Sequence, residues 1–204
     1  TPGDLKAALA TTKPKVVGIV MAETSTGAWQ PIEEISKLVH DAGALLLVDA
    51  VTALGGVPVE VDGWNIDAIY SGSQKCLSCP PGLAPVSFNQ RAIDVILNRK
   101  QKVQSWYLDV SMLRKYYTGG GGGGRVYHHT APINMTYALH EALVIVLEEG
   151  LEARIARHEK MQLRLRSALS APGIQYIPIR SLPSLTVISL PAPPAQAGGP
   201  TRLP

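Results

Sequence analysis

Three short apolar runs, each ending in polar residues, constrain the fold of this chain more than any other feature. The runs are Lys15–Met21, Ala44–Val48 and Ile66–Tyr70. Runs of this length are typical of strands that are covered on both faces. Apolar residues at helical spacing lie between the first two runs: Ile32, Ile35, Leu38 and Val39. The order strand, helix, strand, connection, strand predicts an α/β fold with a mainly parallel sheet flanked by helices.

The rest of the chain predicts the domain organisation. Leu83–Phe88 follows the tight turn Pro80-Pro81-Gly82 and is predicted to be a fourth, antiparallel strand. We expect residues 1–135 to form a partial large domain. Residues 136–190 are predicted to hold long connecting helices and the start of a small C-terminal α+β domain. The Pro- and Ala-rich residues 191–204 predict a disordered tail.

The composition excludes several classes of protein. Of the 204 residues, 46% are hydrophobic and 17% are charged, and the net charge of +3 comes from scattered basic residues with no run of four. This pattern gives no electrostatic footprint for a nucleic-acid partner. No stretch reaches the roughly 18 apolar residues that a membrane span needs, and the first residues lack a signal-peptide pattern. We therefore expect a soluble intracellular protein with no membrane partner.

A cysteine motif and a glycine motif carry little functional information. Cys76 and Cys79 form one Cys-x-x-Cys pair, whereas a structural zinc site needs four ligands, so we expect no metal site. A redox pair is the alternative to simple packing of small residues beside Lys75. The six glycines at 119–124 formally match a dinucleotide-binding motif, but no strand leads into them, and a flexible loop is expected instead.

Polar side chains follow all three predicted parallel strands. Thr24-Ser25-Thr26 follows the first strand, and Asp49 ends the second. After the third strand come Ser71, Ser73, Gln74 and Lys75. Because open α/β sheets bind ligands at the carboxyl ends of their strands, we expect hydroxyls, a carboxylate and a lysine to converge at one edge. A lysine in such a place can form a Schiff base with a carbonyl compound; an ordinary surface lysine is the alternative.

Pyridoxal phosphate is the cofactor that fits this combination of residues. It requires a lysine for its aldehyde, an acid beside its pyridine nitrogen, and donors for its phosphate. We predict that Lys75 forms the Schiff base (internal aldimine) and moves the substrate proton as a general base and acid. Asp49 is predicted to pair with the pyridinium, and Thr24 and Gln74 to hydrogen-bond the cofactor.

Four segments together resemble the class V, fold-type I aminotransferases, which depend on pyridoxal phosphate. The segments are Ala22–Gly27, Leu46–Gly56, Tyr70–Lys75 and Tyr127–Thr130, in that order along the chain. The resemblance covers nearly all of residues 1–190. It implies transfer of an amino group from alanine or serine to a small 2-oxo acid, glyoxylate or pyruvate.

The resemblance also implies residue roles and a partner. It places Val51 against the cofactor ring, and it implies a homodimer in which Tyr127 and Thr130 bind the phosphate of the cofactor held by the other subunit. The implied compartment is the cytoplasm or the peroxisome. The family's N-terminal phosphate-binding turn, its ring-stacking aromatic residue and most of its C-terminal domain do not occur in this sequence. We therefore expect an incomplete enzyme.

Several alternatives remain open within and outside the family. A cysteine desulfurase is expected to carry histidine immediately before the lysine, and Gln74 in that place argues against one. Aminotransferases for aminoethylphosphonate or phosphoserine remain alternatives, because the residues that select a substrate lie largely in the missing segments. A truncated chain without catalytic activity is the alternative of a different class. A general α/β binding module would not need Asp49 and Lys75 together.

Overall fold

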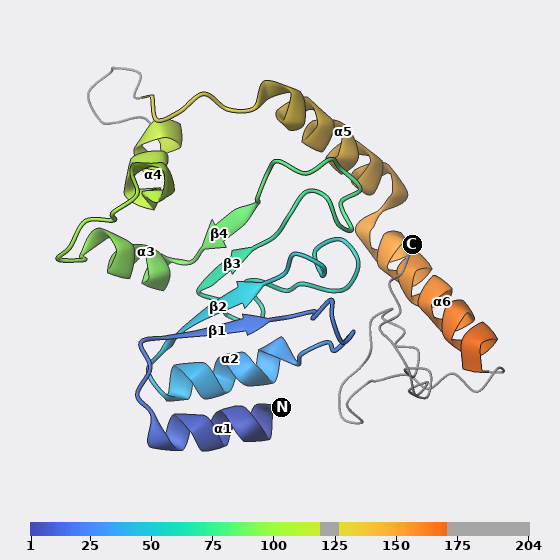
Figure 1. Ribbon diagram of the computed structural model, residues 1–204, viewed down its shortest axis with the longest axis horizontal. Helices are drawn as coiled ribbons and strands as arrows, with labels where there is room; N and C mark the ends of the chain where they lie inside the picture. The colour runs from blue at the N-terminus through green and yellow to red at the C-terminus, as the bar shows by residue number, and fades with distance from the viewer. Residues whose placement is uncertain (119–126, 171–204) are drawn as a thin grey trace, which may run out of the picture.

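The computed structural model describes residues 1–118 and 127–170, which contain a four-stranded sheet with helices around it (Figure 1). The strands lie in the order in which they occur along the chain: β1 (Val16–Val20), β2 (Leu45–Asp49), β3 (Ala68–Tyr70) and β4 (Val86–Phe88). β1, β2 and β3 are parallel, and β4 pairs antiparallel with β3. The predicted α/β class with a mainly parallel sheet is confirmed, and so is the antiparallel fourth strand.

Helices flank this sheet on several sides. Their bounds are α1 (Pro2–Thr11), α2 (Ile32–Asp41), α3 (Gln90–Leu97), the 3-10 helix η1 (Trp106–Leu108), α4 (Val110–Thr118), α5 (Ile133–Glu149) and α6 (Leu151–Ser170). In Figure 1, α1 and α2 lie together below the sheet, while α3 and α4 follow β4 on the left. α5 and α6 run down the side toward which β1 and β2 point, so they pass the carboxyl edge of the sheet.

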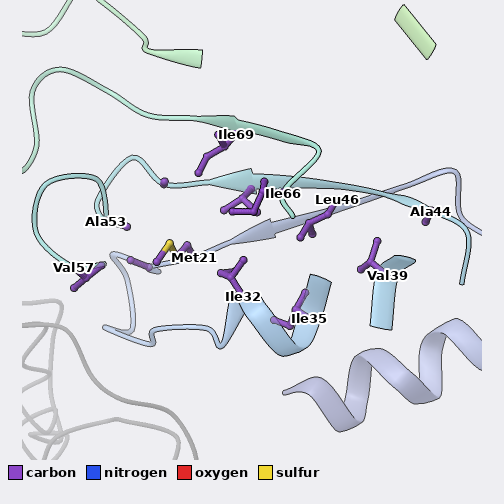
Figure 2. Close-up of a cluster of buried hydrophobic side chains, with 13 residues drawn as sticks. Met21, Ile32, Ile35, Val39, Ala44, Leu46, Ala53, Val57, Ile66 and Ile69 are labelled. Atoms are coloured by element: carbon purple, nitrogen blue, oxygen red, sulfur yellow. The ribbon is translucent and has the colours of Figure 1, made fainter. Parts of the chain in front are cut away.

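The main hydrophobic core lies between α2 and the sheet. The predicted stripe on α2 is largely buried: Ile32, Ile35 and Val39 are at most 2% exposed. They meet Leu46 of β2 and Ile66, which precedes β3, in the cluster shown in Figure 2. Each side chain of this kind contributes about 1.5–3 kcal/mol when it leaves water. This packing fixes β2 in the sheet and, with it, the position of the strand end that carries the candidate carboxylate.

β1 and β2 are not covered on both faces within the described residues, so that expectation is wrong. Val16 and Val20 of β1 are 52% and 37% exposed. On β2, Leu46 and Val48 are buried, while Leu45 and Leu47 are only half-buried. The reason is that α1 and α2 lie on one side of the sheet and β1 is an edge strand.

Two successive helices, α5 and α6, form the C-terminal part of the described residues. α5 ends at Glu149 and is followed by Gly150, whose φ of +81° is a backbone conformation that glycine adopts without strain. The part of the predicted small C-terminal domain beyond residue 170, the glycine run and the 191–204 tail lie outside the described residues. Among residues 1–118 and 127–170, no helix combines the length and the apolar character that crossing a membrane requires.

Candidate active site

The carboxyl ends of the three parallel strands lie side by side. Val20, Asp49 and Tyr70, the last residues of β1, β2 and β3, are partners in the sheet register. The ladder continues past the strands, because Met21 N donates to Asp49 O at 2.8 Å and Ala50 N donates to Tyr70 O at 2.9 Å. The predicted meeting of the three strand ends at one edge is therefore confirmed.

Asp49 carries the carboxylate at this edge, and two donors orient it. Its Oδ1 accepts a hydrogen bond from Val51 N at 2.8 Å, and its Oδ2 accepts one from Tyr70 Oη at 2.7 Å. A carboxylate offers about four lone-pair sites, so each oxygen can accept a further donor. The hydrogen bond to Asp49 raises the pKa of Tyr70, which keeps the phenol protonated and donating.

Tyr70 is a site residue that the sequence analysis did not identify as functional. The signal that could have found it is the register: Asp49 and Tyr70 both end their strands, and residues opposite each other on neighbouring strands project to the same face. The sequence shows both strand ends but not their register.

Lys75 lies in a tight turn after β3, here called the lysine turn (residues 73–80). Ser78 N donates to Lys75 O at 2.9 Å, and Ser78 has a φ of +59°, which is unusual for a residue other than glycine. Ser73 is fully buried, and its hydroxyl donates to Pro80 O at 2.7 Å. The Lys75 side chain is exposed, and none of the described residues forms a hydrogen bond or an ion pair with its amine.

Cys76 packs the lysine turn against the turn that follows β2. A Cβ atom at Gly56 would lie 2.7 Å from Cys76 Sγ, so only glycine fits there without a shift. Cys76 Sγ donates to Thr52 O at 3.6 Å, and burial raises the pKa of the Cys76 thiol. Cys79 is buried and, like Cys76, is a free thiol. A raised thiol pKa opposes redox reactivity, which supports the packing interpretation of this pair.

Arg154 of α6 contacts the lysine turn, and it is not among the residues predicted from the sequence. Its side chain is 4% exposed, and its Nη2 donates to Cys76 O at 2.6 Å and to Ser78 Oγ at 3.0 Å. Its Nη1 donates to Glu149 Oε2 at 2.8 Å. Glu149 also accepts hydrogen bonds from Arg157, and these, with the Arg154 contact, lower the pKa of Glu149 to about 2. Glu149 therefore remains charged beside the buried guanidinium.

The other predicted residues of this edge lie near the strand ends, where Val51 contacts Asp49 through its backbone N–H. Thr24 is exposed in the turn after β1, and Val51, half-buried, follows Asp49 directly. Gln74 is exposed, and its side chain folds back over Gly72, where a Cβ atom would lie 2.8 Å from Gln74 Oε1. Among the described residues, no hydrogen bond joins Thr24 or Gln74 to Asp49 or to Lys75.

Tyr127 and Thr130 lie on a different part of the molecule from Lys75. Their segment runs between the grey trace and α5 at the upper left of Figure 1, whereas β1 and β2 point to the right. Tyr127 is 70% exposed and Thr130 is exposed. Between them, buried His128 stacks on Trp106 with ring centroids 4.2 Å apart, and its Nε2 donates to Trp106 O at 2.9 Å. A single chain does not bring Tyr127 and Thr130 to the lysine.

The residues at the carboxyl edge suit pyridoxal phosphate in their chemistry. Asp49 is a half-buried carboxylate with free lone pairs, as an acid beside a pyridine N–H must be. Lys75 presents an exposed amine that an aldehyde can reach, and Thr24 presents an exposed hydroxyl. This donor set fits the cofactor.

Known proteins are similar to this chain in sequence and in fold. Residues 1–192 match the family described as aminotransferase class-V. Alanine–glyoxylate aminotransferase of Rattus norvegicus is 39% identical over 192 residues, which cover 93% of this chain and 46% of that protein. The solved structure of alanine–glyoxylate aminotransferase from Nostoc sp. superposes with a TM-score of 0.80 at 47% identity, covering 86% of this chain and 45% of that one. For ureidoglycine–glyoxylate aminotransferase from Bacillus subtilis the TM-score is 0.80 at 41% identity, covering 89% and 46%.

Over most of its length the chain is similar to proteins named aminotransferases in both sequence and fold. The chain belongs to the class-V aminotransferase family. The predicted family resemblance is thereby confirmed. The chain spans about half the length of the curated relatives and solved structures that it matches.

Proposed function

We propose that this chain supplies the pyridoxal-phosphate-binding part of an aminotransferase that moves an amino group from alanine or serine to glyoxylate or pyruvate. The observation that carries the proposal is the carboxyl edge, where Asp49 is held with free lone pairs one strand away from the turn that presents Lys75. We further propose the division predicted from the sequence, with a partial large domain at 1–135 and connecting helices with the start of a small domain at 136–190.

Each residue at the edge has a proposed role. The bound cofactor withdraws electrons from the substrate Cα, which makes the Cα proton easier to remove. Lys75 would hold the cofactor aldehyde through its Nζ with loss of water; once displaced by the substrate amine, it would take up and return a proton at Nζ. Asp49 accepts a hydrogen bond from the pyridine N–H and keeps that nitrogen protonated. Val51 packs against the ring.

Two further groups of residues hold the cofactor in this proposal. Thr24 and Gln74 donate hydrogen bonds to it from turns beside the strand ends. Tyr127 and Thr130 bind the phosphate of the cofactor in a second copy of the chain. The support for action across a dimer is their exposure, together with their place away from the carboxyl edge of their own chain (Figure 1).

The names of the similar proteins bear on the substrates. Rat and Nostoc relatives are alanine–glyoxylate aminotransferases, and the Bacillus relative is a ureidoglycine–glyoxylate aminotransferase. Glyoxylate occurs in all three names, while the amino donor differs. We therefore propose glyoxylate as the preferred acceptor and alanine as the preferred donor, with ureidoglycine as a second candidate donor.

The test is a transamination assay on the purified protein with added pyridoxal phosphate. Each donor (alanine, serine, ureidoglycine, phosphoserine, aminoethylphosphonate) is paired with glyoxylate and with pyruvate, and product is measured for the parent protein and for Lys75→Ala. Borohydride reduction followed by peptide mass spectrometry locates the attached cofactor. Lys37→Ala is the matched control, because Lys37 is a well-exposed lysine on α2.

The proposal expects alanine and glyoxylate to react fastest and the cofactor to be fixed to Lys75. Lys75→Ala should lose activity by at least about 10²-fold, while Lys37→Ala retains it. Equal amounts of borohydride-fixed cofactor in the parent and in Lys75→Ala would refute the proposal and favour the non-catalytic alternative. A clear preference for phosphoserine or aminoethylphosphonate would assign the chain to another class-V activity.

A further inference from the structure

We propose that Arg154 is a positioning residue, which holds the lysine turn in place from α6 and so sets where the Lys75 amine lies. The inference rests on the proposed role of Lys75. It concerns two hydrogen bonds from α6 to the lysine turn, which lie outside the residues expected to touch the cofactor.

Arg154 contacts two residues of the turn that Lys75 begins, Cys76 and Ser78. Cys76, whose carbonyl accepts from Arg154 Nη2 at 2.6 Å, is the next residue after Lys75. Ser78, whose hydroxyl accepts from the same nitrogen at 3.0 Å, closes the turn by donating its N–H to Lys75 O. One guanidinium nitrogen therefore holds the two residues that determine the path of the backbone immediately after Lys75.

The turn needs contacts from outside to hold its shape. Ser78 has a positive φ, and a non-glycine residue in that region persists only when its surroundings hold it there. Within the turn, the Ser73 hydroxyl contacts Pro80, and from the segment after β2 Gly56 approaches Cys76 closely. Arg154 reaches the turn from 76 and 78 residues further along the chain.

The side chain suits this task because it is a buried, paired arginine. Arg154 Nη1 pairs with Glu149 while its Nη2 donates hydrogen bonds to the lysine turn. The planar fork of an arginine can make both contacts at the same time, and the single ammonium group of a lysine cannot. Within the described residues, Arg154 Nε has no hydrogen-bond partner, so the two Nη groups carry the polar contacts of this buried ion. Removing them leaves the Cys76 carbonyl without its charged donor.

A loosened turn should impair the chemistry that depends on Lys75. Catalysis depends on reacting atoms being held in place, and a displacement of about 1 Å can cost about 10²-fold in rate. A residue that acts on the backbone beside the reacting lysine therefore affects kcat and the proton equilibrium of the attached amine, and it does so without touching the substrate.

The experiment compares three variants of the full chain: Arg154→Met, Arg154→Lys and Arg157→Met. Arg157 is the matched control, because it lies on the same helix and pairs with the same Glu149, while its side chain is about half exposed. None of the contacts that the structure gives for Arg157 within the described residues reaches the lysine turn. Arg154→Lys keeps the positive charge without the fork, and it carries the test if Arg154→Met does not fold.

The first readout needs no cofactor. The rate of alkylation of the half-buried Cys76 thiol and the amide exchange of residues 76–79 are measured by peptide mass spectrometry. The second readout uses protein loaded with pyridoxal phosphate: the pH midpoint of the absorbance band of the Lys75-bound cofactor, and kcat and KM separately. A residue that only adds stability would change neither the pH midpoint nor the ratio of the two kinetic constants.

Arg154→Met should raise Cys76 alkylation and amide exchange about ten- to a hundredfold, shift the pH midpoint and lower kcat, with Arg154→Lys between it and the parent. Arg157→Met should stay within about twofold of the parent. Equal behaviour of Arg154→Met and Arg157→Met overturns the proposal, and so does a loosened turn with an unchanged pH midpoint and kcat. If the parent attaches no cofactor at Lys75, the proposed function fails; the thiol and exchange contrast then still decides whether Arg154 holds the turn.

Discussion

Two aspartates at opposite ends of the sheet show how differently this chain uses a carboxylate. Asp67, just before β3, is fully buried and accepts hydrogen bonds from four groups at 2.7–3.1 Å: Leu46 N, His40 Nε2, Asn89 Nδ2 and Arg91 Nη1. Asp49, at the end of β2, is half-buried and accepts from two groups, Val51 N and Tyr70 Oη.

The difference separates a structural carboxylate from a chemically available one. Burial by itself would raise the pKa of Asp67, but the hydrogen bonds from Leu46, Asn89 and His40 and the charge of Arg91 outweigh it, so the pKa lies below its ordinary value. Its lone pairs are committed to the protein. Asp49 keeps acceptor capacity at the ligand-binding edge of the sheet. A carboxylate with fewer partners than lone pairs is the better candidate for binding something else.

The largest expected effect comes from removing the two carboxylates in turn. Asp67→Ala should lower the free energy of unfolding by about 3–5 kcal/mol, because it leaves buried donors and the Arg91 charge without their partner. Asp49→Ala should lower it by about 1 kcal/mol, since its two hydrogen bonds lie at a half-buried position. Urea unfolding of both variants measures the contrast. Equal losses would contradict the distinction between the two ends of the sheet.

The second prediction concerns the free energy of unfolding at acid pH. The folded-state pKa of Asp67 lies below its ordinary value of 3.8, so the unfolded chain binds this proton at a higher pH than the folded chain does. The contribution of Asp67 is therefore fully present above about pH 3.8 and is lost as the pH falls through the lower folded value. The free energy of unfolding is measured by urea titration at pH values about one unit apart, from about pH 6 down to about pH 2. It should fall steeply below about pH 4.

Asparagine variants supply the control for this pH dependence. Asp67→Asn should lose part of the fall below pH 4, because the titrating group is gone, while Asp49→Asn should keep it. A fall that Asp67→Asn retains in full would assign acid sensitivity to other carboxylates.

The smallest expected effect tests the link between Tyr70 and Asp49. Tyr70→Phe should lower the free energy of unfolding by about 1 kcal/mol, because one hydrogen bond to a carboxylate is lost at a partly exposed site. The parent-minus-variant absorbance difference follows the ionisation of Tyr70 alone. That ionisation should occur above the ordinary tyrosine pKa of 10.0, and in the Asp49→Asn background it should move back toward 10.0. An unchanged midpoint in that background would show that Asp49 does not hold the Tyr70 proton.

The sequence by itself determined the order of strands and helices around the site. Apolar runs gave β1, β2 and β3, helical spacing gave α2, and turn residues gave the reversal before β4, because each of these depends on neighbours within a few residues. That order was enough to predict that Asp49 and Lys75 follow neighbouring strands. For residues 110–118, which form α4, no helix was predicted.

Only the tertiary structure decided which side chains meet. The exposure of Val16 on β1 depends on which helices cover the sheet, and the pairing of Tyr70 with Asp49 depends on the register of two strands. In the sequence, Arg154 is one of several charged residues of a predicted helix. In the folded chain it is buried and contacts Cys76, which lies 78 residues away. Contacts at such separation depend on how whole elements pack, which is why residues beside the site were found only in the folded chain.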